Sequence, residues 1–213
     1  MINKHMITLR NIIFFSIILF LQSLSAQDNK NVEEGDWMLS SRIGFGTLEV
    51  EDVAKTNATV AEVFLGREFL LSNQFSLYTG LEFSNVNSNF ANGSNQNLFL
   101  SNDYLSLPIN LRISYDDAEK LSLYADFGIY GSYLLKSTVE IEADDLDDSE
   151  NGLGFNFGYQ VAFGAKYKFQ DSRYSINFGL RTKNDLINSY KSSEQEFQIN
   201  DVYLIEIGLG FAL

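Results

Sequence analysis

The side chains that could carry chemistry in this chain are charged. They lie in segments where apolar residues alternate with small or polar ones, and they occupy the small or polar positions. The two signs balance, with Arg42, Arg112, Lys166, Arg173 and Arg181 set against Glu62, Glu68, Glu82, Asp126 and Glu206. Such charges could form a path for protons or ions, a gated pore, or a network of ion pairs. Because an unpaired buried charge is costly, the even balance favours mutual pairing.

A second group of candidate residues is the acidic run E-I-E-A-D-D-L-D-D-S-E-N at 140–151. Hard cations prefer clustered oxygen ligands, and Asp145, Asp147 and Asp148 would supply them to calcium. The EF-hand spacing fails, because Glu150 stands where that motif needs a glycine. Runs of like charge are usually solvated. We therefore expect an exposed acidic loop, with a weak cation site as the alternative and no resident metal.

The residues of most enzyme mechanisms are nearly absent. The chain has one histidine, His5, and no cysteine, so without its first residues it could not build a Ser–His pair, and we expect neither an enzyme nor a cofactor. Loss of Lys4 and Arg10 with a leader would move the formal net charge from −13 to −15. Phosphate binding needs basic patches, so nucleic acid is excluded as a partner.

The amino terminus has the pattern of a secretory signal peptide. Lys4 and Arg10 flank the start of an apolar run at 12–21, and Q-S-L-S-A-Q follows it. A membrane-spanning helix, the alternative, needs about 20 apolar residues. We expect a signal peptide at 1–26, an N-terminal periplasmic segment at 27–36 and one domain at 37–213.

The elements that position the charges are β-strands. From Gly152 to Phe169 every second residue is apolar or aromatic, and the residues between them are small, polar or basic. Side chains alternate faces along a strand, so this stretch predicts one long strand with two unlike faces. The same period recurs and predicts an all-β fold of eight strands: 37–47, 58–70, 74–84, 103–115, 120–136, 152–169, 173–183 and 202–213.

The connections between these strands alternate in expected length. Those at 71–73, 116–119 and 170–172 are short, and those at 48–57, 85–102, 137–151 and 184–201 are long. All short connections then fall at one end of an up-and-down sheet. Outer-membrane barrels have this asymmetry, with short periplasmic turns and long extracellular loops.

The direction of the apolar face separates a membrane barrel from a soluble ligand-binding barrel, which would point that face inward. Glycine and charges of both signs share the polar face, which suits the narrow interior of an eight-stranded barrel. Aromatic residues gather near the strand ends on the apolar face: Trp37, Tyr115, Tyr133, Tyr167, Phe169, Tyr174, Tyr203 and Phe211. Such girdles mark membrane interfaces. We therefore expect an eight-stranded antiparallel transmembrane β-barrel with lipid outside and the charges inside.

Three segments carry a resemblance to a known family. The stretch Y-L-S-L-P-I-N-L-R-I at 104–113, the glycine-rich strand at 152–169 and I-E-I-G-L-G-F-A-L at 205–213 resemble the PorT-like outer-membrane β-barrel family of Gram-negative bacteria. The resemblance implies an eight-stranded barrel with no assigned activity, and one branch of the family assists a secretion system. Such proteins generally end on an aromatic residue that the assembly machinery reads, whereas this chain has Phe211 followed by Ala212 and Leu213.

The leading hypothesis is a non-enzymatic, monomeric outer-membrane barrel whose loops serve surface interaction or envelope structure. Its expected partners are outer-membrane lipid, the barrel-assembly machinery and an extracellular or secretion-system protein. The alternatives are an accessory barrel of a secretion apparatus and a soluble periplasmic lipid- or ligand-binding barrel. A last set of residues is expected to form a lumen charge network with a structural role: Arg42, Glu62, Glu82, Arg112, Asp126, Lys166, Arg181 and Glu206.

Overall fold

The computed structural model describes residues 34–50, 54–91, 97–118, 120–141, 146–170 and 172–211. They form eight strands: β1 (Glu34–Val50), β2 (Ala54–Leu70), β3 (Phe75–Ala91), β4 (Asn97–Ala118), β5 (Leu121–Ile141), β6 (Leu146–Lys168), β7 (Tyr174–Tyr190) and β8 (Phe197–Phe211). No helix in this part of the chain is long and apolar enough to cross a membrane. The expected signal peptide at 1–26 and the first residues of the 27–36 segment lie outside the described residues, and β1 begins at Glu34, within the segment expected to precede the barrel.

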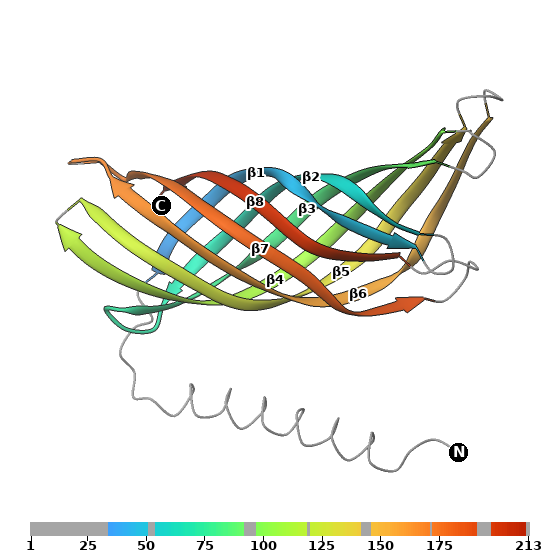
Figure 1. Cartoon of the computed structure of the whole chain (residues 1–213). Coiled ribbons are helices and arrows are strands. Elements are labelled where there is room, and N and C mark those ends of the chain that lie inside the picture. Colours follow the sequence, from blue (N-terminus) through green and yellow to red (C-terminus); the bar gives the residue numbers. More distant parts are fainter. Residues whose placement is uncertain are drawn as a thin grey trace, which may run out of the picture. The chain divides into compact units, whose positions relative to one another are not determined.

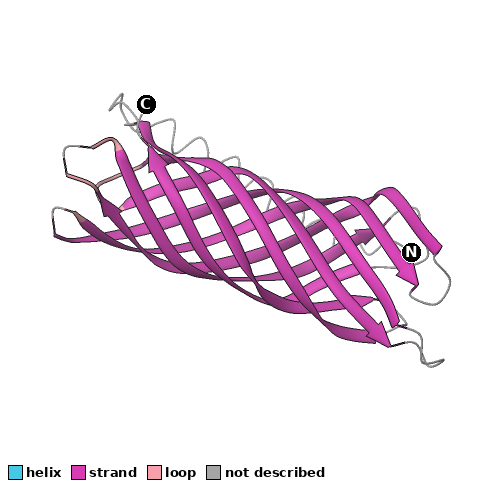
Figure 2. Ribbon diagram, turned by 90° about the horizontal axis from the view of Figure 1, so that it is seen from above, coloured by secondary structure: helices cyan, strands magenta, loops and turns pink. Residues whose placement is uncertain are grey.

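The eight strands close into one barrel in which every strand pairs antiparallel with its neighbours in sequence, and β8 pairs with β1. The strands run obliquely around the barrel (Figure 1) and cross those of the far wall when seen from above (Figure 2). Closure removes the unpaired edges that an open sheet would expose. The prediction of an eight-stranded antiparallel up-and-down barrel is confirmed.

Each strand presents its large apolar side chains to the outside over part of its length. On β6, for example, Phe163 is 60% exposed, whereas Ala162 on the opposite face is 2% exposed. The aromatic residues predicted at the strand ends also face outward, and Trp37, Phe211 and Tyr174 are cross-strand neighbours near one end of the barrel. An exposed apolar surface of this extent on a closed barrel is the surface that contacts lipid in an outer-membrane protein.

The strands are longer than the alternating pattern predicts, so the expected connection lengths are wrong. Most of 48–57, 85–102, 137–151 and 184–201 belongs to strands, and only 51–53, 92–96, 142–145 and 191–196 remain as connections between them. The membrane needs about 9–11 residues per strand, and these strands have 15 to 23. The ladders therefore continue well past the apolar outer surface.

The face pattern inverts in these extensions. On β3, Leu81 and Phe83 face outward, but farther along the strand Asn85, Asn87 and Asn89 take the outward positions. The inward positions change from charged to apolar in the same step. Neither face of such a strand stays apolar or polar over its whole length. A search for one apolar face therefore ends where the inversion begins, and it misses the extensions.

Candidate functional site

The candidate site is the barrel interior, where the alternation of every strand delivers side chains to a common space. Arg42 on β1, Glu62 on β2, Glu82 on β3 and Glu206 on β8 come together although they lie far apart in sequence. The Arg42 Nε donates to Glu206 Oε2 at 2.8 Å, and its guanidinium also pairs with Glu62 at 3.3 Å and with Glu82. One arginine thus joins carboxylates from three strands.

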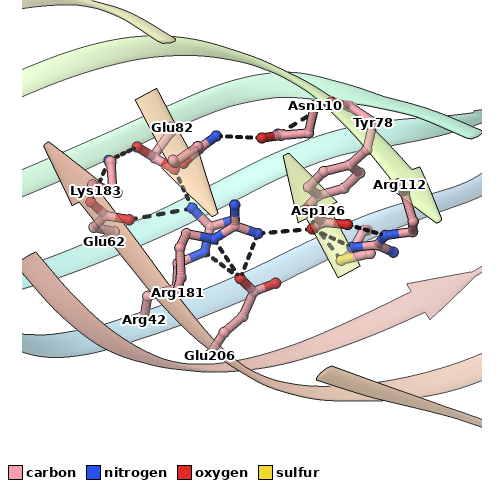
Figure 3. A network of polar contacts seen from close by, with 12 residues as sticks. Arg42, Glu62, Tyr78, Glu82, Asn110, Arg112, Asp126, Arg181, Lys183 and Glu206 are labelled. Carbon is pink, nitrogen blue, oxygen red and sulfur yellow. Dashed lines mark hydrogen bonds and ion pairs between the residues drawn. The ribbon is translucent and has the colours of Figure 1, made fainter. Parts of the chain in front are cut away.

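A second arginine extends this cluster across the barrel (Figure 3). Arg181 on β7 donates to Glu206 Oε2 at 3.0 Å and to Asp126 Oδ2 at 3.2 Å. Asp126 on β5 in turn accepts two bonds from Arg112, at 2.7 and 3.0 Å. A bidentate arginine–carboxylate pair of this kind fixes both side chains in one geometry.

The pairs join into one chain of alternating sign along the interior. In order, the chain comprises Asp36, Lys166, Glu68, Arg112, Asp126, Arg181, Glu206, Arg42, the pair Glu62 and Glu82, and Lys183, and we refer to it below as the interior charge chain. Its weakest link is Arg112 to Glu68 at 4.0 Å, and Lys183 ends it at 2.5 Å from Glu82. Because every charge has an opposite neighbour, the chain compensates the desolvation that burial imposes.

Aromatic rings flank three of the cations in the interior charge chain, and one of them is Lys183, 4.8 Å from the ring centre of Tyr130. The Arg112 guanidinium lies 4.6 Å from the ring centre of Tyr78 and 4.0 Å from that of Tyr124. Arg42 lies over Phe64 at 5.0 Å. A cation over the face of an aromatic ring is attracted by the ring quadrupole, and more strongly where water is excluded.

The structure places all eight predicted network residues inside the barrel, each at most 9% exposed. Glu68 joins them, but Arg173 does not: it lies exposed just before β7, where alternation has not yet begun. Asp145 lies outside the described residues, and only the backbone of Asp147 and Asp148 is described. The calcium site therefore stays a prediction. Among the residues whose side chains are described, no group of three or more acidic residues or histidines could hold a metal ion.

Sequence reasoning missed Lys183 and Asp185, although alternation on β7 predicts both. They follow Arg181 at the same two-residue spacing. Lys183 is the last residue of the expected seventh strand but was not counted among its inward charges, and Asp185 lies beyond the expected end of that strand. Asp185 accepts bonds from Tyr130 at 2.7 Å, from Asn156 at 2.8 Å and from the Ile199 backbone at 2.9 Å. A cavity of about 20 Å³ between Lys183, Asp185 and Tyr130 has room for about one water molecule.

Beyond Lys183 the interior becomes largely apolar, although Asn102 and Ser137 are also buried there, with the Ser137 hydroxyl donating to Asn102 at 2.7 Å. A group of buried side chains from β1 to β5 and β8, which we term the apolar plug, fills the barrel toward the 51–53, 92–96, 142–145 and 191–196 connections: Leu48, Ala58, Val60, Val86, Phe90, Leu100, Tyr104, Leu134, Phe197, Val202 and Leu204. Leu48 and Val86 are 0% exposed. The interior thus has two consecutive fillings, one ionic and one apolar.

Comparison with known proteins agrees with this architecture. The model of the outer membrane protein beta-barrel domain family matches residues 16–211. No curated protein gives a significant match. The PorT-like branch within outer-membrane barrels stays a prediction.

Two solved structures illustrate the similarity in fold. The outer membrane protein OprG from Pseudomonas aeruginosa matches with a TM-score of 0.51 and 14% identity, over 83% of this chain and 95% of that one. The Neisserial surface protein A, NspA, matches with a TM-score of 0.50 and 9% identity, over 83% of this chain and 97% of that one. At these identities the likeness concerns the fold alone.

Proposed function

This chain belongs to the outer membrane protein beta-barrel domain family, and from that premise we propose that it is a non-enzymatic outer-membrane barrel closed to ions and solutes. Its role is then surface interaction or envelope structure, carried by the strand extensions and the connections beyond them. The expected partners are outer-membrane lipid, the barrel-assembly machinery and a protein bound at the cell surface, and the barrel acts as a monomer.

The observation that carries this proposal is the double filling of the interior. Eight strands leave an interior just wide enough for side chains. The interior charge chain occupies one part of it with side chains such as Arg112 at 1% and Asp126 at 0% exposure. The apolar plug occupies the next part. A hydrated ion would have to separate buried ion pairs and then cross an apolar region.

The connections at the two ends of the barrel are of similar length, so the proposed orientation rests on the strand extensions, which we place outside the cell. Connections 71–74, 119–120 and 169–173 lie at the end opposite the apolar plug. The apolar plug, the polar outer face around it and the acidic segment at 140–151 then lie outside the cell. This arrangement follows the usual topology of outer-membrane barrels.

Conductance in planar lipid bilayers tests the closure. The refolded full chain is expected to give no stable single-channel current, while a shift in gel mobility on heating verifies that the barrel is folded. A reproducible wild-type current would overturn the closed interior.

An accessory role in protein secretion is a rival that rests on the resemblance to PorT-like barrels. Deletion of the gene separates the two roles: loss of proteins from the culture medium would favour the secretion role, and an unchanged set of secreted proteins favours the role proposed above. A soluble periplasmic ligand-binding barrel is the other rival. Its apolar side chains would point inward, and recovery of the protein in the soluble periplasmic fraction would support it.

A further inference from the structure

Two hollows on the outside of the barrel share residues and form one groove. The first hollow has a volume of about 660 Å³ and the second about 570 Å³, and Phe45 and Thr59 line both. Both hollows are open to the outside along one side, so an occupant would lie in a shallow groove. The chemistry of the groove changes along its length, because it crosses from the apolar band of the outer surface to the polar strand extensions.

The first hollow is apolar and lies over the seam where β8 pairs with β1. Its outward side chains include Ile43, Phe163, Leu180 and Ile205, which are between 49% and 67% exposed. Arg181 also lines it, but its guanidinium is bonded inside the barrel to Asp126 and Glu206. A register shift interrupts the β1–β8 ladder after Phe45. The hollow therefore opens on the lipid-facing surface at an irregularity in the wall.

The strand register connects the two hollows directly. Six outward residues are successive cross-strand partners from β6 through β7, β8, β1 and β2 to β3: Val161, Thr182, Tyr203, Phe45, Thr59 and Asn87. Phe45 and Tyr203 pack at 5.9 Å between ring centres, and the small Thr59 follows them in the row. Because the strands are tilted, this row passes obliquely from the apolar band to the polar extension.

The second hollow is polar and uncharged. Asn57, Asn87 and Asn89 line it together with Thr56, and Phe45 and Phe99 are its aromatic members. Side-chain amides both donate and accept hydrogen bonds, as sugar hydroxyls do. Aromatic rings supply apolar surface with a polar edge for the faces of sugar rings. None of the residues lining this hollow is acidic or basic, so it offers no ion pair to a phosphate or an ammonium group.

We propose that this groove binds one molecule of a glycolipid of the outer leaflet, with an acyl chain in the apolar hollow and a neutral saccharide on the asparagines. The occupant must be an amphiphile, because one end of the groove matches hydrocarbon and the other matches hydroxyl groups. A phospholipid satisfies only the apolar end, since no residue lining the polar end is charged and the nearby Lys55 is paired with Asp201 at 3.3 Å.

Native mass spectrometry of the full chain in a neutral detergent tests the proposal with three lipids of equal acyl chains: diglucosyl dioleoylglycerol, dioleoylphosphatidylcholine and dioleoylglycerol. One diglucosyl lipid per barrel is expected, with a preference of about tenfold over the other two. Binding in micelles needs neither a closed interior nor a given orientation, so it is independent of the proposed function.

Three variants locate the binding site. Thr59→Trp blocks the junction and is expected to lower binding of the diglucosyl lipid about tenfold. The double substitution Asn57→Ala with Asn89→Ala removes two amides and is expected to reduce that lipid to the level of phosphatidylcholine. Thr79→Trp, at an outward position of β3 that lines neither hollow, is the matched control and should leave binding unchanged.

Equal retention of all three lipids by the wild type would show only general lipid contact and overturn the proposal. The same loss in Thr79→Trp as in Thr59→Trp would also overturn it. Heat-dependent gel mobility confirms that each variant is folded before its binding is compared.

Discussion

Arg112 shows at the scale of single residues how a charge is held inside this barrel. Its guanidinium makes two bonds to Asp126 and lies between the rings of Tyr78 and Tyr124. The paired carboxylate compensates its charge, and the rings exclude water from its two faces. Removal of the arginine would leave Asp126 buried with Arg181 as its remaining cation partner.

Arg112→Met is therefore expected to lower the free energy of unfolding by about 3–5 kcal/mol, the usual cost of breaking a buried pair from one side. Urea unfolding in detergent, followed by the fluorescence of the single tryptophan, Trp37, measures it. Arg173→Met at the exposed end of the barrel is the control, with an expected change within about 0.5 kcal/mol. Equal losses in the two variants would contradict a buried network.

Glycine on the inward face makes room for rings from the neighbouring strand. A Cβ on Gly164 would lie 2.4 Å from the Tyr124 ring and 2.6 Å from the Phe178 carbonyl oxygen. A Cβ on Gly210 would approach closely only the Ser175 hydroxyl, which can rotate away. The first site thus has no space for a methyl group, whereas the second has.

Gly164→Ala is accordingly expected to destabilise the barrel by about 1–3 kcal/mol, because overpacking forces the ring and backbone to shift. Gly210→Ala is the matched control and should lose much less. The two unfolding midpoints in urea decide the matter, and a reversed order would refute the steric explanation.

At the scale of elements, the inward and outward faces of a strand exchange polar and apolar residues along its length. β3 carries Glu82 inward within the apolar band and Val86 inward beyond it, while its outward residues change from Phe83 to Asn89. Within the apolar band, the arrangement is that of a barrel surrounded by lipid. Beyond the band, it is that of a barrel surrounded by water. Stability of the extension then depends on the apolar plug rather than on lipid.

Val86→Asn is expected to cost about 1–3 kcal/mol, because the new amide loses the apolar contact with Val60 and lies beside Asn102, whose side-chain oxygen already accepts from Ser137. The extension should then become sensitive to protease before the membrane part unfolds. Asn89→Val, its outward counterpart on the same strand, should change stability by about 0.5 kcal/mol or less. Limited proteolysis with mass mapping in detergent distinguishes the two variants, and protection of the extension in Val86→Asn would argue against the plug.

At the scale of the whole molecule, two different fillings close the barrel in sequence. The interior charge chain disfavours hydrophobic solutes, which cannot replace its ion pairs. The apolar plug disfavours ions, because the few buried polar groups beside it, such as Asn102 and Ser137, are already bonded to each other. A single substitution in either filling leaves the other in place. The absence of current expected in planar bilayers should therefore persist in Arg112→Met and in Val86→Asn.

Alternation alone determined most of the architecture. A period of two residues with glycine and balanced charges on one face predicted eight strands, their order and the direction of each face. It also identified network residues such as Arg42 and Glu206, because inward positions follow from parity. It failed at Arg173, which lies before its strand begins, and at Asp185, which lies beyond the expected end of its strand. Lys183 was within that expected strand but was not recognised as an inward charge.

The tertiary structure alone decided which charges meet and where the strands end. Arg42 and Glu206 are adjacent only because β8 closes onto β1, and no local pattern encodes that register. The sequence pattern did not predict the strand extensions. Outward residues are apolar against lipid and polar against water, so the alternation reverses along a strand while its backbone hydrogen bonds continue. The groove is likewise a property of the register, since it aligns Val161, Phe45 and Asn87 from three distant strands.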